Sequence, residues 1–178
     1  MNKFDNNTIK SWVVDALTEF YHDDSDMIES LGEVPISIRI GMHIFKKFYC
    51  LQEYDYRVDC EYDKAAMDPK PAPQGYTGGK HMRPDIIIHK RAKKGEPRDV
   101  GNLLFCEIKK KVPNRNDKEK LEYAISEAYK YQLAVSIHHI EPDSIKITWY
   151  EKGNAPCEVK YTYDVKRLVE VMIHEIHV

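Results

Sequence analysis

The chain has 178 residues, of which 42% are apolar and 31% are charged. This length and composition are typical of one globular domain with its own core, and we expect that domain to span residues 1–178. No apolar run approaches the ~20 residues that cross a bilayer, and the first ten residues lack the apolar segment of a secretory signal peptide, so we expect a cytoplasmic protein without a membrane partner. The net charge of −2 excludes a chain that is basic overall.

The first third of the chain predicts two helices. Residues 6–21 place apolar side chains at helical intervals, and Asn6 or Asn7 is expected to cap this helix. Residues 32–53 predict a second helix, with Pro35 in its first turn. The side chains expected on its apolar side are Ile36, Ile40, Ile44, Phe45 and Phe48.

The middle of the chain predicts three strands. Residues 56–63 alternate between apolar and acidic side chains, as a strand with one buried face does. Residues 64–82 contain three prolines and three glycines and read as a long loop. Residues 83–91 and 102–111 follow as two strands separated by about ten polar residues, a spacing typical of an antiparallel hairpin.

The last third predicts a helix over 117–132, capped by Asp117, then strands over 133–140, 144–151 and 157–163. Residues 164–176 read as a closing helix. This order predicts an α/β or α+β domain in which helices flank a mixed sheet.

Two carboxylates are expected to meet on this sheet. Side chains alternate along a strand, so Glu107 and Lys109 share one face, while Cys106 and Ile108 share the other. If the hairpin strands pair in register, Asp85 lies across from Glu107 at a strand spacing near ~4.8 Å. Carboxylates that close repel unless a cation separates them, and a hard divalent ion, Mg²⁺ first, would do so. No CxxC pair occurs among the cysteines, which argues against a zinc knuckle.

The (D/E)xK triplet alone is weak support for such a site, because the chain contains it four times. Its other copies begin at Asp68, Glu158 and Asp164. Only the Glu107 copy lies in an apolar strand and follows a strand that opens with Pro84-Asp85. The competing interpretation is a plain ion pair between Glu107 and Lys109.

With these motifs the sequence resembles the PD-(D/E)xK nuclease superfamily, the fold of many restriction endonucleases. Pro84-Asp85 corresponds to its PD and residues 107–109 to its ExK, and the element order matches its αβββαβ core. The resemblance is closer still to small uncharacterised bacterial members, through Glu33, Ile36 and Arg39 and through "VDCEY" at 58–62. It spans about residues 33–135. It implies a restriction-endonuclease-like core over about 33–151, with additional N- and C-terminal helices.

The resemblance implies a metal-dependent nuclease that hydrolyses phosphodiester bonds, with DNA as the expected substrate. Asp85, Glu107 and the Ile108 carbonyl would bind Mg²⁺ or Mn²⁺, and Glu33 would add a ligand directly or through water. Lys109 would orient the attacking water and complete the catalytic set. Between residues 80 and 120 the chain has 13 Lys and Arg against 6 Asp and Glu, a balance that fits phosphate contacts or solvated loops. The expected phosphate contacts are Lys80, Arg83, Arg91, Lys110, Lys111 and Arg115.

Two other functions stay open from the sequence. The chain could be a catalytically inactive nuclease fold that binds nucleic acid or protein. Its charges could instead serve a protein interface, including that of a homodimer.

Overall fold

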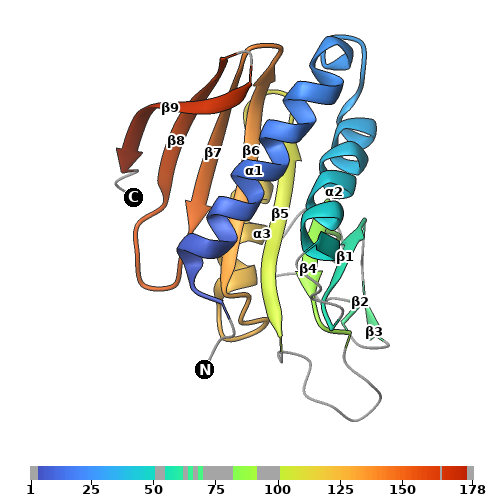
Figure 1. Ribbon diagram of the computed structural model, residues 1–178. Coiled ribbons are helices and arrows are strands. Elements are labelled where there is room, and N and C mark those ends of the chain that lie inside the picture. Colours follow the sequence, from blue (N-terminus) through green and yellow to red (C-terminus); the bar gives the residue numbers. More distant parts are fainter. Residues whose placement is uncertain are drawn as a thin grey trace.

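The computed structural model describes residues 4–50, 55–61, 64–65, 68–69, 82–91, 101–164 and 166–175. This part of the chain forms an α+β fold with three α-helices and a seven-stranded mixed sheet in the order β1-β4-β5-β6-β7-β8-β9. Helices α1 and α2 lie on one face of the sheet and α3 lies on the other (Figure 1). None of the described helices is long and apolar enough to cross a membrane.

The two N-terminal helices were predicted correctly in type and approximate position. Helix α1 runs over Asn6–Asp24, and α2 runs over Glu33–Cys50. The cap of α1 is Asp5 and not Asn6 or Asn7, because the Asp5 carboxylate accepts a hydrogen bond from the backbone N–H of Thr8 at 2.9 Å.

The strands expected from alternation form an antiparallel meander. Strand β1 (Arg57–Cys60) pairs with β4 (Ile86–His89), and β4 pairs with β5 (Asn102–Lys109), both antiparallel. The predicted hairpin is therefore confirmed. Residues 64–82 lie mostly outside the described residues, apart from a two-stranded ribbon of β2 (Lys64–Ala65) and β3 (Asp68–Pro69).

Helix α3 makes the crossover to a parallel strand. It runs over Arg115–Ile125 and leads to β6 (Leu133–Glu141), which pairs with β5 in parallel. The prediction over 117–132 was too long, because the chain turns extended at Ser126. The cap is Asn114, and Asp117 is the third residue of a capping box and not the cap itself.

The rest of the sheet is antiparallel and ends in a strand where a helix was predicted. Strands β7 (Ser144–Tyr150), β8 (Cys157–Asp164) and β9 (Arg167–Glu175) follow one another. Alternating β-branched residues, Val169, Val171 and Ile173, favour a strand, and β8 offers a free edge for backbone hydrogen bonds. The predicted C-terminal helix over 164–176 was therefore wrong.

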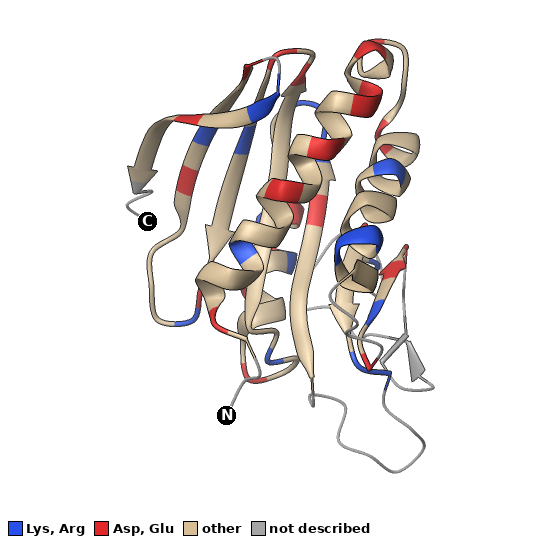
Figure 2. Cartoon of the chain, viewed as in Figure 1, with Lys and Arg blue, Asp and Glu red and all other residues tan. Residues whose placement is uncertain are grey.

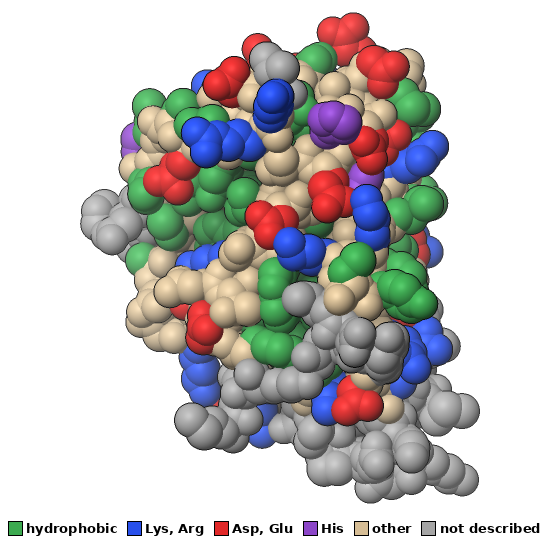
Figure 3. Space-filling model, in the orientation of Figure 1, with side chains coloured by type: hydrophobic (Ala, Val, Ile, Leu, Met, Phe, Trp, Pro, Cys, Tyr) green, Lys and Arg blue, Asp and Glu red, His purple; other side chains and the backbone are tan. Residues whose placement is uncertain are grey.

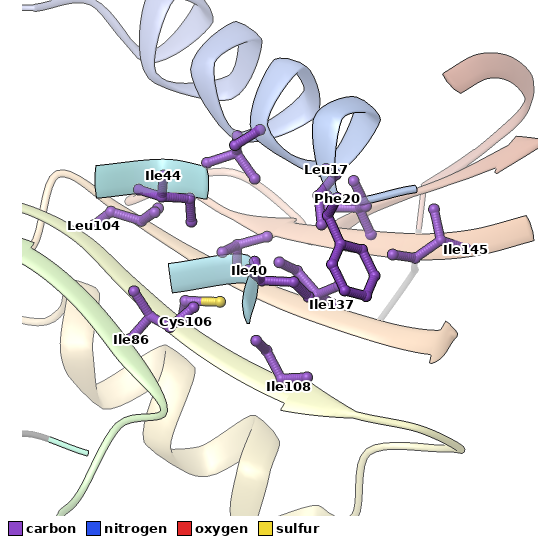
Figure 4. Close-up of a cluster of buried hydrophobic side chains, with 14 of the residues drawn as sticks. Leu17, Phe20, Ile40, Ile44, Ile86, Leu104, Cys106, Ile108, Ile137 and Ile145 are labelled. Atoms are coloured by element: carbon purple, nitrogen blue, oxygen red, sulfur yellow. The ribbon is translucent and has the colours of Figure 1, made fainter. Parts of the chain in front are cut away.

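The sheet separates two cores of unequal size. The larger core joins α1 and α2 to one sheet face, where Leu17, Ile40 and Ile108 are fully buried (Figure 4). The smaller core joins α3 to the opposite face around Phe105 and Leu121. Because side chains alternate along β5, Phe105, Glu107 and Lys109 point toward the α3 side of the sheet. On this side the strand changes from apolar to polar at Glu107.

Close packing also fixes α2 against the edge of the sheet. A Cβ added at Gly41 would lie 2.5 Å from the Sγ of Cys60 on β1, so only glycine permits this approach. The inner side of α2 differs from the prediction at one position. Ile36, Ile40, Ile44 and Phe48 are buried, whereas Phe45 is 52% exposed and points away from the core.

Candidate active site

Strand register brings Asp85 beside Glu107. Ile86 on β4 pairs with Cys106 on β5, and Asp85 immediately precedes that pair. The Oδ2 atom of Asp85 accepts a hydrogen bond of 2.6 Å from the backbone N–H of Ile108. The Glu107 side chain projects toward α3 and the residue is 1% exposed. Two carboxylates therefore lie close together at the edge of the core, in the arrangement that strand alternation predicted.

A cationic partner of Glu107 comes from α3 and was missed in the sequence. The Nζ atom of Lys120 donates a hydrogen bond to Glu107 Oε2, and it lies 3.9 Å from the Oδ1 atom of Asp117. Lys120 is 9% exposed. A signal for it exists in the sequence, since Asp117 and Lys120 share the helical face of the buried Leu121 and Ala124. Charged residues on an apolar helical stripe indicate a buried polar contact.

Lys109 links the sheet to both flanking helices. Its Nζ atom donates a hydrogen bond of 3.0 Å to Glu33 Oε2 at the start of α2. The same atom lies 4.0 Å from Asp117 Oδ1 on α3. Glu33 therefore lies beside the end of β5, and its contact in the structure is with Lys109. The first-turn position of Glu33 is also favourable for the helix dipole.

The buried carboxylates are held in an environment that opposes their charge. Burial raises the pKa of Glu107 to about 8, against the lowering effect of Lys120. Burial also raises the pKa of Asp85, which the Ile108 N–H and the Lys109 charge partly offset. Burial lowers the pKa of Lys109, but Glu33 and Asp117 outweigh it and the net shift is upward, so this side chain is a cation.

One oxygen of Glu107 has no hydrogen-bond partner among the described residues. Its Oε1 atom is buried without a donor from this part of the chain, although its Oε2 atom contacts Lys120. An unpaired buried carboxylate oxygen is costly and marks a position where a further cation, proton or water is favourable. This atom lies on the carboxylate that neighbours Asp85.

The donor set fits a hard divalent cation. Within the residues that the structure describes, no group of three or more His, Cys, Asp or Glu side chains is arranged to hold a metal ion. Magnesium does not require such a group, because it is usually held by one or two carboxylates and keeps several waters. Asp85, Glu107 and the backbone carbonyl of Ile108 carry oxygen atoms of the kind that such an ion binds.

Most of the residues expected to contact phosphate already have partners within the chain. Arg83 pairs with Glu61 at 2.6 Å, and Arg115 pairs with Glu119 at 2.7 Å. Arg91 lies 2.5 Å from Asp59. The positive charge that these arginines offer to a ligand is therefore partly neutralised.

The remaining basic residues differ in how firmly they are held. Lys110 donates to the backbone carbonyls of Glu29 and Leu31, which ties β5 to the loop before α2. Lys111 is exposed just beyond the end of β5, close in sequence to Lys109. Lys80 lies outside the described residues.

No protein-family model, curated protein or solved structure matches this chain. The likeness to the nuclease superfamily thus rests on the motifs at Glu33, Asp85 and residues 107–109.

Proposed function

We propose that the chain is a metal-dependent nuclease with a restriction-endonuclease-like core, and that it hydrolyses phosphodiester bonds of nucleic acid, with DNA as the expected substrate. One observation carries this proposal. Glu33 at the start of α2 and Asp85 just before β4 meet Glu107 and Lys109 at the end of β5, with Lys109 bonded to Glu33 and Asp85 bonded to the backbone of the triplet.

The order of elements supports the same proposal. Helix α2, strands β1, β4 and β5, helix α3 and strand β6 follow one another as the αβββαβ core of that superfamily does. The first three of these strands are antiparallel and the fourth is parallel to β5. Helix α1 and strands β7 to β9 add to this core.

The residues divide the chemical roles between them. Asp85, Glu107 and the Ile108 carbonyl would hold Mg²⁺ or Mn²⁺, with Glu33 acting through water or through Lys109. Such an ion supplies polarisation of the scissile phosphate and a lowered pKa of a bound water. The Asp85 carboxylate is oriented for this role by the N–H of Ile108.

Lys109 is the residue that acts on the reacting atoms in this proposal. As a cation held by Glu33, it orients the attacking water and stabilises negative charge that develops on the phosphate. Lys111, exposed two residues after Lys109, would contact the nucleic-acid backbone.

Nuclease assays with purified protein test the proposal on single- and double-stranded DNA and on RNA, with Mg²⁺ or Mn²⁺. We expect cleavage that Lys109→Ala lowers at least about 100-fold, as the loss of one charge-stabilising donor typically does. Lys160→Ala is the matched control, because Lys160 ends another ExK triplet on β8 and should leave cleavage unchanged. Absence of cleavage on every substrate, or full cleavage by Lys109→Ala, would refute the mechanism.

A second candidate function is a catalytically inactive module that binds nucleic acid or protein. The contact between Lys120 and Glu107 favours it, because an ammonium group already neutralises one of the proposed metal ligands. Calorimetric titration distinguishes the two. The nuclease should bind Mn²⁺ in a manner that Asp85→Asn abolishes, whereas the inactive module should bind none.

A further inference from the structure

Helix α2 has a second apolar face, opposite the one that packs on the sheet. Its inner side is buried through Ile36, Ile40 and Ile44. Its outer side carries a row of five large apolar residues that we call the outer α2 stripe. These are Val34, Ile38, Met42, Phe45 and Tyr49, each between 45% and 62% exposed. Figure 3 shows hydrophobic side chains along the edge of the molecule where α2 lies.

A helix that is apolar on both sides normally has both sides covered. Among the described elements, the sheet and α1 cover the inner side of α2, whereas the residues of the outer α2 stripe keep about half of their surface exposed. From the exposed fractions, and side-chain areas on the order of 150–250 Å² for aromatic residues, the outer α2 stripe presents roughly 500 Å² of apolar surface. Contiguous patches above a few hundred Å² mark interaction surfaces.

The spacing of the stripe is nearly symmetric about its own centre, with intervals of 4, 4, 3 and 4 residues. When two copies of α2 are laid antiparallel across a two-fold axis near residues 41 and 42, Val34 faces Tyr49 of the other copy and Ile38 faces its Phe45. Met42 faces its own counterpart. Small side chains thus oppose large ones, and the contact is isologous, as a two-fold homodimer requires.

The area is sufficient for a specific but modest contact. Two stripes facing each other would remove about 1,000 Å² from water, which is the lower limit for a specific interface. A depression of about 600 Å³ lies beside the stripe, lined in part by Ile38, Phe45, Val58 and Cys60. It gives room for side chains of the opposing copy.

Charges next to the stripe do not oppose such a contact. Acidic positions on α1 face basic positions on α2 (Figure 2). Lys46 pairs with Glu19 at 2.9 Å, and Lys47 pairs with Asp15 at 2.6 Å. These two lysine charges are neutralised within one copy, so they add little electrostatic repulsion toward a second copy.

From this geometry we propose that the outer α2 stripe is the interface of a homodimer, in which two α2 helices pack antiparallel. The dimer needs no metal ion or nucleic acid. It is independent of the proposed nuclease activity.

Sedimentation equilibrium of the full chain, from about 1 to about 200 µM, tests the interface. We expect a reversible change from the monomer mass of 20.9 kDa to twice that value. Met42→Glu places two carboxylates at the two-fold axis and should weaken the dimer at least about 100-fold. Val112→Glu is the matched control at another exposed apolar position and should leave the dimer intact.

A pair of substitutions tests the antiparallel arrangement. Ile38→Lys and Phe45→Glu should each weaken the dimer, whereas the double variant should recover it, because the two new charges then face each other across the axis. Thermal unfolding followed by circular dichroism verifies that each variant is folded. A wild-type chain that stays monomeric at the highest concentration overturns the proposal. So does a dimer that survives Met42→Glu, or one that only Val171→Glu on the edge strand β9 dissociates.

Discussion

Replacing Glu107 by glutamine is expected to change how stability depends on pH. The folded-state pKa of Glu107 is about 8, above its ordinary value of 4.5, because the side chain is buried. A carboxyl group with a raised folded pKa contributes most stability below its unfolded pKa, and that contribution is lost as pH rises toward the folded pKa. Glutamine has nearly the same shape and does not titrate.

The magnitude follows from the width of this window. Between pH 5.5 and 7.5 the unfolded chain has already released most of the Glu107 proton, whereas the folded chain largely keeps it. Each pH unit then lowers the free energy of unfolding by up to about 1.4 kcal/mol. Over this range the free energy of unfolding should therefore fall by about 2.5 kcal/mol more in the wild type than in Glu107→Gln.

Urea unfolding of both proteins at pH 5.5 and 7.5 measures this difference. For a domain of this size, this difference corresponds to a decrease of about 1 M in the urea midpoint of the wild type between the two pH values, measured relative to the variant. Titrations elsewhere in the chain affect both proteins equally and cancel in the comparison. If the two proteins show the same dependence on pH, Glu107 is not held in its neutral form and our account of the site's electrostatics is incorrect.

Three further substitutions test neighbouring contacts by urea unfolding. Lys120→Met leaves Glu107 without its cation. It should lower the free energy of unfolding by about 3 kcal/mol at pH 9, above the pKa of about 8 at which the Glu107 carboxyl ionises, and this loss should be recovered when it is combined with Glu107→Gln. An additive loss in the double variant would contradict the pairing. Burial lowers the pKa of His138 to about 4, so the free energy of unfolding of the wild type should fall by about 2 kcal/mol as pH falls from 7 to 5. That of His138→Gln should not fall. An equal decrease in both proteins would exclude a buried neutral imidazole. Gly41→Ala should lower the free energy of unfolding by about 1–3 kcal/mol, because the added methyl group clashes with Cys60. Adding Cys60→Ala to this variant should restore much of the loss. An unchanged urea midpoint for Gly41→Ala would refute the close packing of α2 on β1.

The adjacency of Asp85 and Glu107 could be predicted because it depends on local rules. Side-chain alternation assigns each residue of β4 and β5 to a face, and a short connection makes antiparallel pairing of the two strands the simplest arrangement. Both strands also lie between clear turn signals. Register and face together placed the carboxylates without knowledge of the rest of the fold.

Lys120 could not be placed in the same way, because its contact depends on how α3 packs on the sheet. A helical pattern gives the buried side of α3 but not the strand residue that each side chain meets. The C-terminal strand β9 was missed for a different reason. Residues 164–176 fit a helical period and an alternating one, and the free edge of β8, a tertiary feature, decides between them.

The unequal cores on the two sides of the sheet have a consequence for local motion. Helix α3 is held by the smaller core, so its separation from the sheet breaks fewer apolar contacts than the loss of α1 and α2 would. Segments of this kind open transiently while the remainder of a domain stays folded, and their amide hydrogens exchange sooner. Each such opening would withdraw Lys120 and Asp117 and expose Glu107 to solvent, while Asp85 and Glu107 stay fixed on their strands.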